Sequence, residues 1–167
     1  LTSKGISGGT MDKKDDRPRR YLAERCELLG AIRLPNNAFL SNAGTDITTD
    51  LVILQKLEMP RQLGAELPLW VQTDTLMEQE HTNSRGETRR NFVTINRYFQ
   101  GHPEMVLGNL EVESGPYGPQ LVCKPIPGAD LAQQLHEAVS HIQGRITAVE
   151  LPELGGGDED APVEHSI

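Results

Sequence analysis

The sequence predicts an α/β fold, organised as the far end of a larger sheet followed by a small α+β appendage. Two short apolar runs, LLGAIRL at 28–34 and ITTDLVILQK at 47–56, have the composition of buried strands. A helical segment precedes the first run, and the residues LTS at 1–3 resemble the end of a further strand. A strand stub, a helix and two strands are too few to complete a sheet, and this order is typical of the far end of an α/β sheet.

A helix is expected after the stub, over residues 16–27. Asp15 or Asp16 is a suitable N-cap, and Pro18 is tolerated in the first helical turn. The buried face of this helix is expected to be a narrow stripe, made of Tyr21, Leu22 and Cys26.

Pro35 ends the strand at 28–34, and a polar loop at 36–46 leads to the second strand. Beyond Leu57 the chain is punctuated by prolines, and its apolar runs are short. Within 71–95 a polar stretch separates two such runs. Its residues Ser84, Arg85 and Gly86 have the character of a turn and predict the tip of a hairpin.

The last predicted helix begins at the N-cap Asp130. One stripe of it is apolar, formed by Leu131, Leu135, Val139 and Ile142. His136 and His141 are five positions apart in this helix, so they point to different faces and we expect no shared metal ion. The acidic, glycine-rich segment 151–167 is expected to be disordered.

The charge is unevenly distributed along the chain. The net charge is −8, and it argues against a simple basic nucleic-acid binder. Residues 1–60 carry nine basic and eight acidic side chains, whereas residues 61–167 carry seven and sixteen. Only the first third could therefore approach a polyanion without an electrostatic penalty.

The cysteines and the apolar runs indicate where the protein is located. Cys26 and Cys123 have no neighbouring His or Cys, so we expect reduced thiols in a cytoplasmic protein, with a disulfide as the alternative. No run approaches the roughly 18 apolar residues of a membrane span, and we expect no membrane partner.

Phe39 is the conspicuous residue of the polar loop, where Asn36, Asn37 and other small polar residues surround it. One interpretation is an apolar plug that seals the edge of the sheet. The other is a stacking platform for a planar ligand such as a nucleobase, with the asparagine amides beside it as hydrogen-bonding groups. The residues alone leave both interpretations open.

Several charged residues are weaker candidates for contacts with DNA. A cluster of basic residues near the helix start alternates with acids, which favours a solvated surface; it comprises Lys13, Lys14, Arg17, Arg19 and Arg20. Arg85, Arg89 and Arg90 form a cleaner basic patch at the hairpin tip and could contact the phosphate backbone. His102 and Glu104 are more typical of a turn with a capping network than of a polar site.

Three motifs together resemble one enzyme family. The segments RRYLAERCELLGAIRLPNNAF, AGTDITTDLVILQK and INRYFQGHPEMVLGNLE are similar to the C-terminal part of adenine-specific (N6) DNA methyltransferases. The similar group is the large bacterial and phage enzymes in which this domain is often joined to a helicase. The resemblance covers about residues 1–147.

This resemblance implies a Rossmann-like class I methyltransferase sheet. Its fifth strand would end near residues 1–3, its sixth would be Leu28–Leu34, and its seventh, Thr48–Gln55, would insert antiparallel between them. The S-adenosyl-L-methionine motif and the Asn-Pro-Pro-Tyr-type catalytic motif would lie upstream, so the resemblance implies no catalytic residue and no bound cofactor in this chain alone. In related enzymes an aromatic residue just before the seventh strand stacks on the flipped adenine, and Phe39 occupies that place.

The sequence therefore leads to one hypothesis with one alternative. The hypothesis is a fragment of a DNA adenine-N6 methyltransferase: residues 1–58 end the methyltransferase domain, 59–150 form an appended recognition module, and 151–167 form the tail. Its expected partners are DNA, the upstream methyltransferase half and a helicase domain of the same polypeptide. The alternative is a non-catalytic DNA- or protein-binding module derived from a methyltransferase.

Overall fold

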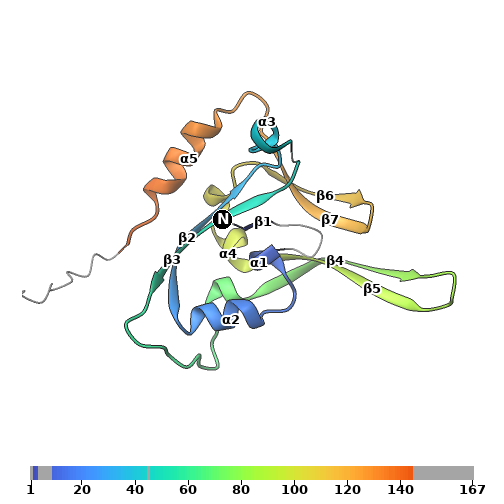
Figure 1. Ribbon diagram of the computed structural model, residues 1–167, viewed down its shortest axis with the longest axis horizontal. Helices are drawn as coiled ribbons and strands as arrows, with labels where there is room; N and C mark the ends of the chain where they lie inside the picture. Colours follow the sequence, from blue (N-terminus) through green and yellow to red (C-terminus); the bar gives the residue numbers. More distant parts are fainter. Residues whose placement is uncertain (1, 4–8, 45, 145–167) are drawn as a thin grey trace, which may run out of the picture.

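The computed structural model describes residues 2–3, 9–44 and 46–144 of the chain, and the predicted tail at 151–167 lies outside this part. The fold is mixed α/β, built from small antiparallel sheets and short helices (Figure 1). Most of the helices and strands pack together into one unit, called the body below, and a long hairpin projects from it to one side.

The first sheet has the strand order that the sequence predicted. It contains β1 (Thr2–Ser3), β2 (Cys26–Leu34) and β3 (Thr49–Lys56) in the order β1-β3-β2. Strand β3 is antiparallel to both neighbours, as expected for a strand inserted between two others. This order and these directions are confirmed, whereas the wider Rossmann-like sheet is not contained in the described residues.

The helix before β2 is shorter than predicted. Helix α2 spans Arg17–Ala23, and β2 already begins at Cys26. The reason is a pair of backbone bonds across the chain, because the amides of Leu57 and Arg61 donate to the carbonyls of Arg25 and Glu24. These bonds hold the residues after α2 against the loop that follows β3.

The buried face of α2 also differs from the predicted stripe. Tyr21 is 58% exposed, and the buried residues of the helix are Arg19 and Ala23. The Nε and Nη1 atoms of Arg19 donate to the carbonyl oxygens of Val71 and Thr10, whereas its buried Nη2 has no hydrogen-bond partner among the described residues. A hydrophobicity pattern cannot predict a buried arginine of this kind. Helix α1 (Gly9–Asp12) lies directly before α2.

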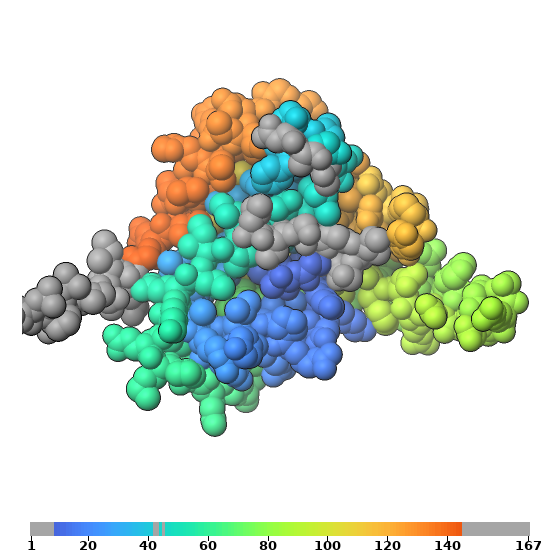
Figure 2. Space-filling model, viewed as in Figure 1, coloured from blue at the N-terminus to red at the C-terminus, as the bar shows by residue number. Residues whose placement is uncertain are grey.

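Two hairpins make up the other sheets. Strands β4 (Thr73–Thr82) and β5 (Thr88–Asn96) pair along their whole length, and the predicted tip at Ser84–Gly86 is confirmed. Strands β6 (Asn109–Gly115) and β7 (Gly118–Lys124) form the second hairpin. Figure 2 shows the β4–β5 tip standing clear of the body.

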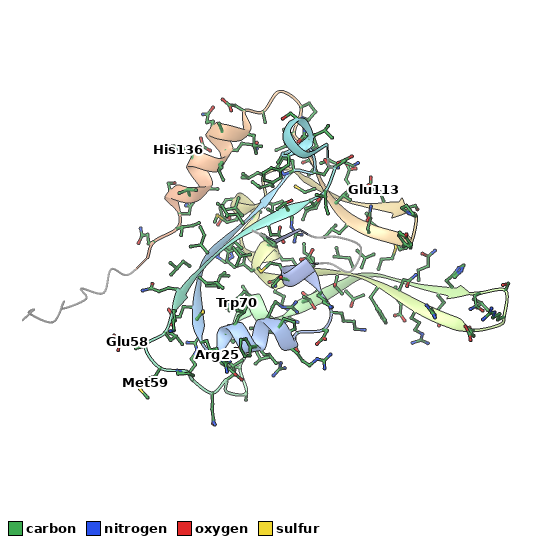
Figure 3. All side chains as sticks on the ribbon, viewed as in Figure 1. Arg25, Glu58, Met59, Trp70, Glu113 and His136 are labelled. Atoms are coloured by element: carbon green, nitrogen blue, oxygen red, sulfur yellow. The ribbon has the colours of Figure 1, made fainter. Side chains whose placement is uncertain are left out.

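Short helices connect these hairpins. The 3₁₀ helix η1 (Leu69–Val71) precedes β4, helix α4 (Arg97–Gly101) follows β5, and η2 (Pro103–Met105) follows α4. Helix α3 (Leu40–Ala43) lies in the loop between β2 and β3. In Figure 3, Glu58 and Met59 point outward from the loop after β3, and Met59 is 78% exposed.

Helix α5 (Leu131–Ser140) is capped as predicted, because the Asp130 carboxylate accepts from the amides of Ala132 and Gln133. Its predicted stripe needs one correction, since Val139 is 46% exposed and Ala138 is buried in its place. The chain after α5 approaches β2 closely at Gly30. A Cβ there would lie 2.7 Å from Cγ1 of Ile142, so glycine permits this contact.

The core consists of two hydrophobic clusters. The first includes Met11 and Ala31 together with Trp70 and Phe99, and the second joins Ile32 and Leu34 to Met105, Leu107 and Ala138. Both clusters take side chains from both sides of residue 58, so the two predicted segments share one core. The division of the chain into segments 1–58 and 59–150 stays a prediction.

The structure also bears on the cysteines and the membrane. Cys26 and Cys123 are not joined by a disulfide. In the part of the chain that the structure describes, no helix has the length and apolar character needed to cross a membrane.

Candidate functional site

The most tightly organised polar site is a buried group of charges centred on Arg33. Its Nε and Nη2 donate to the two carboxylate oxygens of Asp50 at 2.8 and 2.9 Å. Its Nη1 lies 2.8 Å from Oδ2 of Asp12, and all three side chains are almost completely inaccessible to solvent. The guanidinium carbon lies 4.2 Å from the centroid of the Phe99 ring, which adds a cation–π contact.

The β2–β3 pairing explains how these charges meet. Arg33 and Asp50 are direct partners in the register of the two strands, so their side chains share one face. Burial lowers the pKa of Arg33, but the carboxylates of Asp50 and Asp12 raise it more, and the net direction is upward. The guanidinium is therefore permanently charged, and its role is to hold two carboxylates inside the body.

Asn96 joins this group to the downstream half of the chain. Its backbone amide donates to Oδ1 of Asp12 at 2.9 Å, and its side-chain amide donates to the carbonyl oxygens of Met11 and Trp70. The Thr94 hydroxyl donates to the carbonyl oxygen of Asp12. Asn96 also caps α4 by accepting from the amide of Tyr98.

The NRYFQGHPEMVLG segment thus has a structural place. It forms the end of β5, then α4 and η2, and it continues beside β2. The amide of Leu107 donates to the carbonyl of Arg33, and Val106 makes a parallel bridge to Arg33. The segment covers the edge of β2 opposite β3. His102 and Glu104 lie in the predicted turn, where His102 Nδ1 is 2.9 Å from the carbonyl of Tyr98.

The structure places Phe39 at the start of α3, partly buried against the Ile32–Leu34 cluster. This contact is the one expected of an edge plug, and the stacking role stays a prediction. Asn36 is buried and its backbone amide donates to the carbonyl of Cys123. Asn37 is exposed, so the two asparagines of the predicted base-pocket loop face different surroundings.

Asn37 lines a cavity of about 150 Å³ between its loop and α5. Gln134 reaches the same cavity from α5, and the remaining walls are apolar, including Pro35, Leu107 and Leu131. Two amide groups over apolar walls can hydrogen-bond the edge of a heterocycle while its faces lie against carbon. A sequence pattern could not have found Gln134, because it is almost a hundred positions from the loop.

The three predicted backbone-contacting arginines lie on the projecting β4–β5 hairpin and are exposed. Arg90 is engaged with acids of the opposite strand, because its Nε is 2.9 Å from Glu80 and its Nη1 is 3.4 Å from Glu78. Arg85 lies at the tip, and Arg89 faces His81 in the strand register. The three arginines lie on one hairpin, but Arg89 and Arg90 are successive strand residues whose side chains point to opposite faces. The charge of Arg90 is also locally compensated.

The basic residues near α2 are also paired. Arg17 contacts Asp15 and Arg20 contacts Asp16 on the surface, as expected for a solvated helix start. The hydrogen bonds from Arg17 lower the pKa of Asp15 to about 2. Lys14 lies over the Phe92 ring at 3.2 Å. Arg19 is the exception to a solvated start, because it is buried.

Sequence reasoning missed the Arg33 group altogether. The sequence contains a signal for this group, because Arg33 and Asp50 are each the charged residue inside an otherwise mainly apolar predicted strand. Charged residues are rarely fully buried unless they are paired.

In comparisons with known proteins, no family model, no curated protein and no solved structure matches this chain.

Proposed function

We propose that this chain is the C-terminal part of an adenine-specific (N6) DNA methyltransferase, in which it contributes part of the target-base pocket and a DNA-contacting module. One observation carries the proposal: β3 lies antiparallel between β1 and β2. A class I methyltransferase sheet ends in this arrangement, and the resembling motifs assign the same three segments to it.

The chemistry of adenine methylation explains what such a chain must supply. The amino group of a paired adenine is not accessible to a methyl donor, so the base is extruded from the duplex and held in a pocket. Stacking on an aromatic ring is worth about 1–3 kcal/mol per base, which offsets much of the cost of unstacking. Phe39 is the proposed stacking residue. The cavity lined by Asn37 and Gln134 supports a pocket in the same loop, because Ala38, the neighbour of Phe39 in the chain, lines it, although the Phe39 ring itself does not.

This chain's own residues do not fit a cofactor site. Residues 1–167 contain neither the glycine-rich S-adenosyl-L-methionine motif nor the Asn-Pro-Pro-aromatic catalytic motif. In the proposal, an upstream half of the same polypeptide binds the cofactor and performs methyl transfer. The contribution of residues 1–167 is to hold the base and to contact DNA through the β4–β5 hairpin.

The coding sequence upstream of Leu1 tests the proposal directly. We expect it to encode both missing motifs in frame, and we expect the intact protein to place N6-methyladenine in DNA. A start codon close to Leu1 would favour the non-catalytic module instead. A second test uses residues 1–167 alone in calorimetry with S-adenosyl-L-methionine. A stoichiometric micromolar signal would contradict the proposed division of labour.

A further inference from the structure

A second cavity, larger than the one beside Asn37, lies between β2, η1 and the α4–η2 segment. Its volume is about 470 Å³, within the roughly 300–1,000 Å³ that is usual for small-molecule sites. Its walls are apolar on one side and polar on the other, and the apolar side takes Leu29 from β2, Met105 from η2 and Trp70 from η1. Trp70, labelled in Figure 3, is 6% exposed and so belongs to the packed interior.

One wall of this cavity is a rigid aromatic pair. The rings of Tyr98 and His102 are stacked with centroids 4.3 Å apart and planes 19° apart. The phenol oxygen of Tyr98 accepts from the amide of Ala31 in β2, which fixes the ring against the sheet. Both residues line the cavity, so the wall is already formed before a ligand arrives.

The contact of His102 with the backbone determines which of its nitrogens carries hydrogen. Its Nδ1 lies 2.9 Å from the carbonyl oxygen of Tyr98. A carbonyl oxygen can only accept, so Nδ1 must donate, and in the neutral ring Nε2 is an acceptor. The tautomer thus follows from the hydrogen bond, and the neutral ring that lines the cavity has an acceptor nitrogen.

The other polar groups of the cavity also suit a hydrogen-bond donor. Glu104 contributes a carboxylate and His141 a second imidazole, and no lysine or arginine lines the cavity among the described residues. The formal charge of the lining with neutral histidines is therefore negative. Aromatic faces such as the Tyr98 ring also attract cations.

We propose that this cavity binds an organic amine, an aromatic or aliphatic body that carries a protonated amino group. The apolar body lies against Leu29, Trp70 and Met105. The ammonium group donates to the Glu104 carboxylate and to Nε2 of His102. A carboxylate ligand of the same shape is excluded because its charge repels Glu104. This site is independent of the proposed methyltransferase role, and its test requires neither DNA nor a methyl donor.

The test is calorimetry on residues 1–167 with three probes that share an indole body and have side chains of similar length: tryptamine, the neutral alcohol tryptophol, and the anion indole-3-acetate. We expect tryptamine to bind one to one, tryptophol to bind about fivefold to tenfold more weakly, and the anion not to bind. No tryptamine binding up to millimolar concentration, or equal binding of the anion, would overturn the proposal.

Two variants assign the contact. Glu104 is exposed, so Glu104→Gln should leave the melting temperature unchanged. It should weaken tryptamine binding about fivefold to tenfold and leave tryptophol binding unchanged. Glu111→Gln is the matched control, because Glu111 is an exposed acid on β6 that does not line the cavity. If both variants change tryptamine affinity alike, or neither does, the assigned ammonium site is wrong.

Discussion

The Nε atom of Arg33 lies 2.8 Å from Oδ1 of Asp50, and the two residues are direct cross-strand partners. A second carboxylate, that of Asp12, completes the group from α1. Asp12 in turn accepts from the backbone of Asn96 at the end of β5. One arginine therefore connects the sheet to the hairpin that projects from the body.

The first prediction concerns the stability of this group. Replacing Arg33 with Met leaves two carboxylates buried without their cation, so we expect a loss of about 3–5 kcal/mol in the free energy of unfolding. Urea denaturation followed by circular dichroism measures the loss. Arg17→Met is the matched control, because the Arg17 side chain is 86% exposed and its pair with Asp15 lies on the surface. Surface pairs contribute about 0–1 kcal/mol. Equal stability of the two variants would contradict the buried geometry.

Tyr98 gives a prediction about hydrogen bonding and pH. Burial raises the pKa of Tyr98; the amide of Ala31 opposes this shift, and the charge of Glu104 adds to it. Because the folded-state pKa exceeds the ordinary value near about 10, the protonated phenol stabilises the fold at pH values below about 10. This contribution is lost as the pH rises through the folded-state pKa.

The variant Tyr98→Phe tests both aspects. It leaves the Ala31 amide without its acceptor, so we expect a loss of about 1–3 kcal/mol in stability at neutral pH. The difference in tyrosinate absorbance between wild type and variant isolates the Tyr98 titration. Its midpoint should lie above about 10. A midpoint below that value would show that burial does not govern this phenol.

If the intact protein is the proposed methyltransferase, Phe39→Ala separates the two roles predicted for Phe39. The partial burial of Phe39 against the Ile32–Leu34 cluster should make the variant less stable, by less than the roughly 3–5 kcal/mol of a fully buried Phe. If the exposed part of the ring stacks on adenine, base binding per folded molecule should also fall by about 1–3 kcal/mol. Phe39→Trp should keep much of the activity, because stacking requires an aromatic face. Melting and methyl transfer measured on the same Ala variant distinguish the two roles. Normal activity per folded molecule would rule out stacking and assign Phe39 to the edge of the sheet alone.

If the β4–β5 hairpin contacts DNA as proposed, its arginines should differ from one another in their contribution to binding. Arg85→Gln and Arg89→Gln should weaken binding about equally for all DNA sequences and reduce the salt slope by about one each. Arg90→Gln is an internal control and should have the smallest effect, because Glu78 and Glu80 already compensate its charge. Binding titrations at several salt concentrations measure the slope. If the Arg85 and Arg89 variants keep the salt slope of the wild type, these arginines do not contact the DNA backbone.

Local signals predicted much of the fold. The apolar runs around 28–34 and 47–56 have strand composition, and the turn residues at 84–86 have few alternatives, so the strands and the hairpin tip could be predicted from short windows of sequence. The Arg33 group could not, because its partners Asp12 and Asp50 come from other elements and have meaning only once the chain has folded. The same holds for the cavity that Asn37 shares with Gln134.

The bond between Asn96 and Asp12 spans 84 positions of the chain, which has a consequence for synthesis. At the roughly 5–20 residues per second at which polypeptides are made, Asp12 emerges from the ribosome about 4–17 seconds before Asn96 emerges. During this interval Asp12 and Arg33 lack the enclosure that β5 and the residues after it provide. The nascent segment around Asp12 therefore remains open to chaperones and proteases until β5 has emerged.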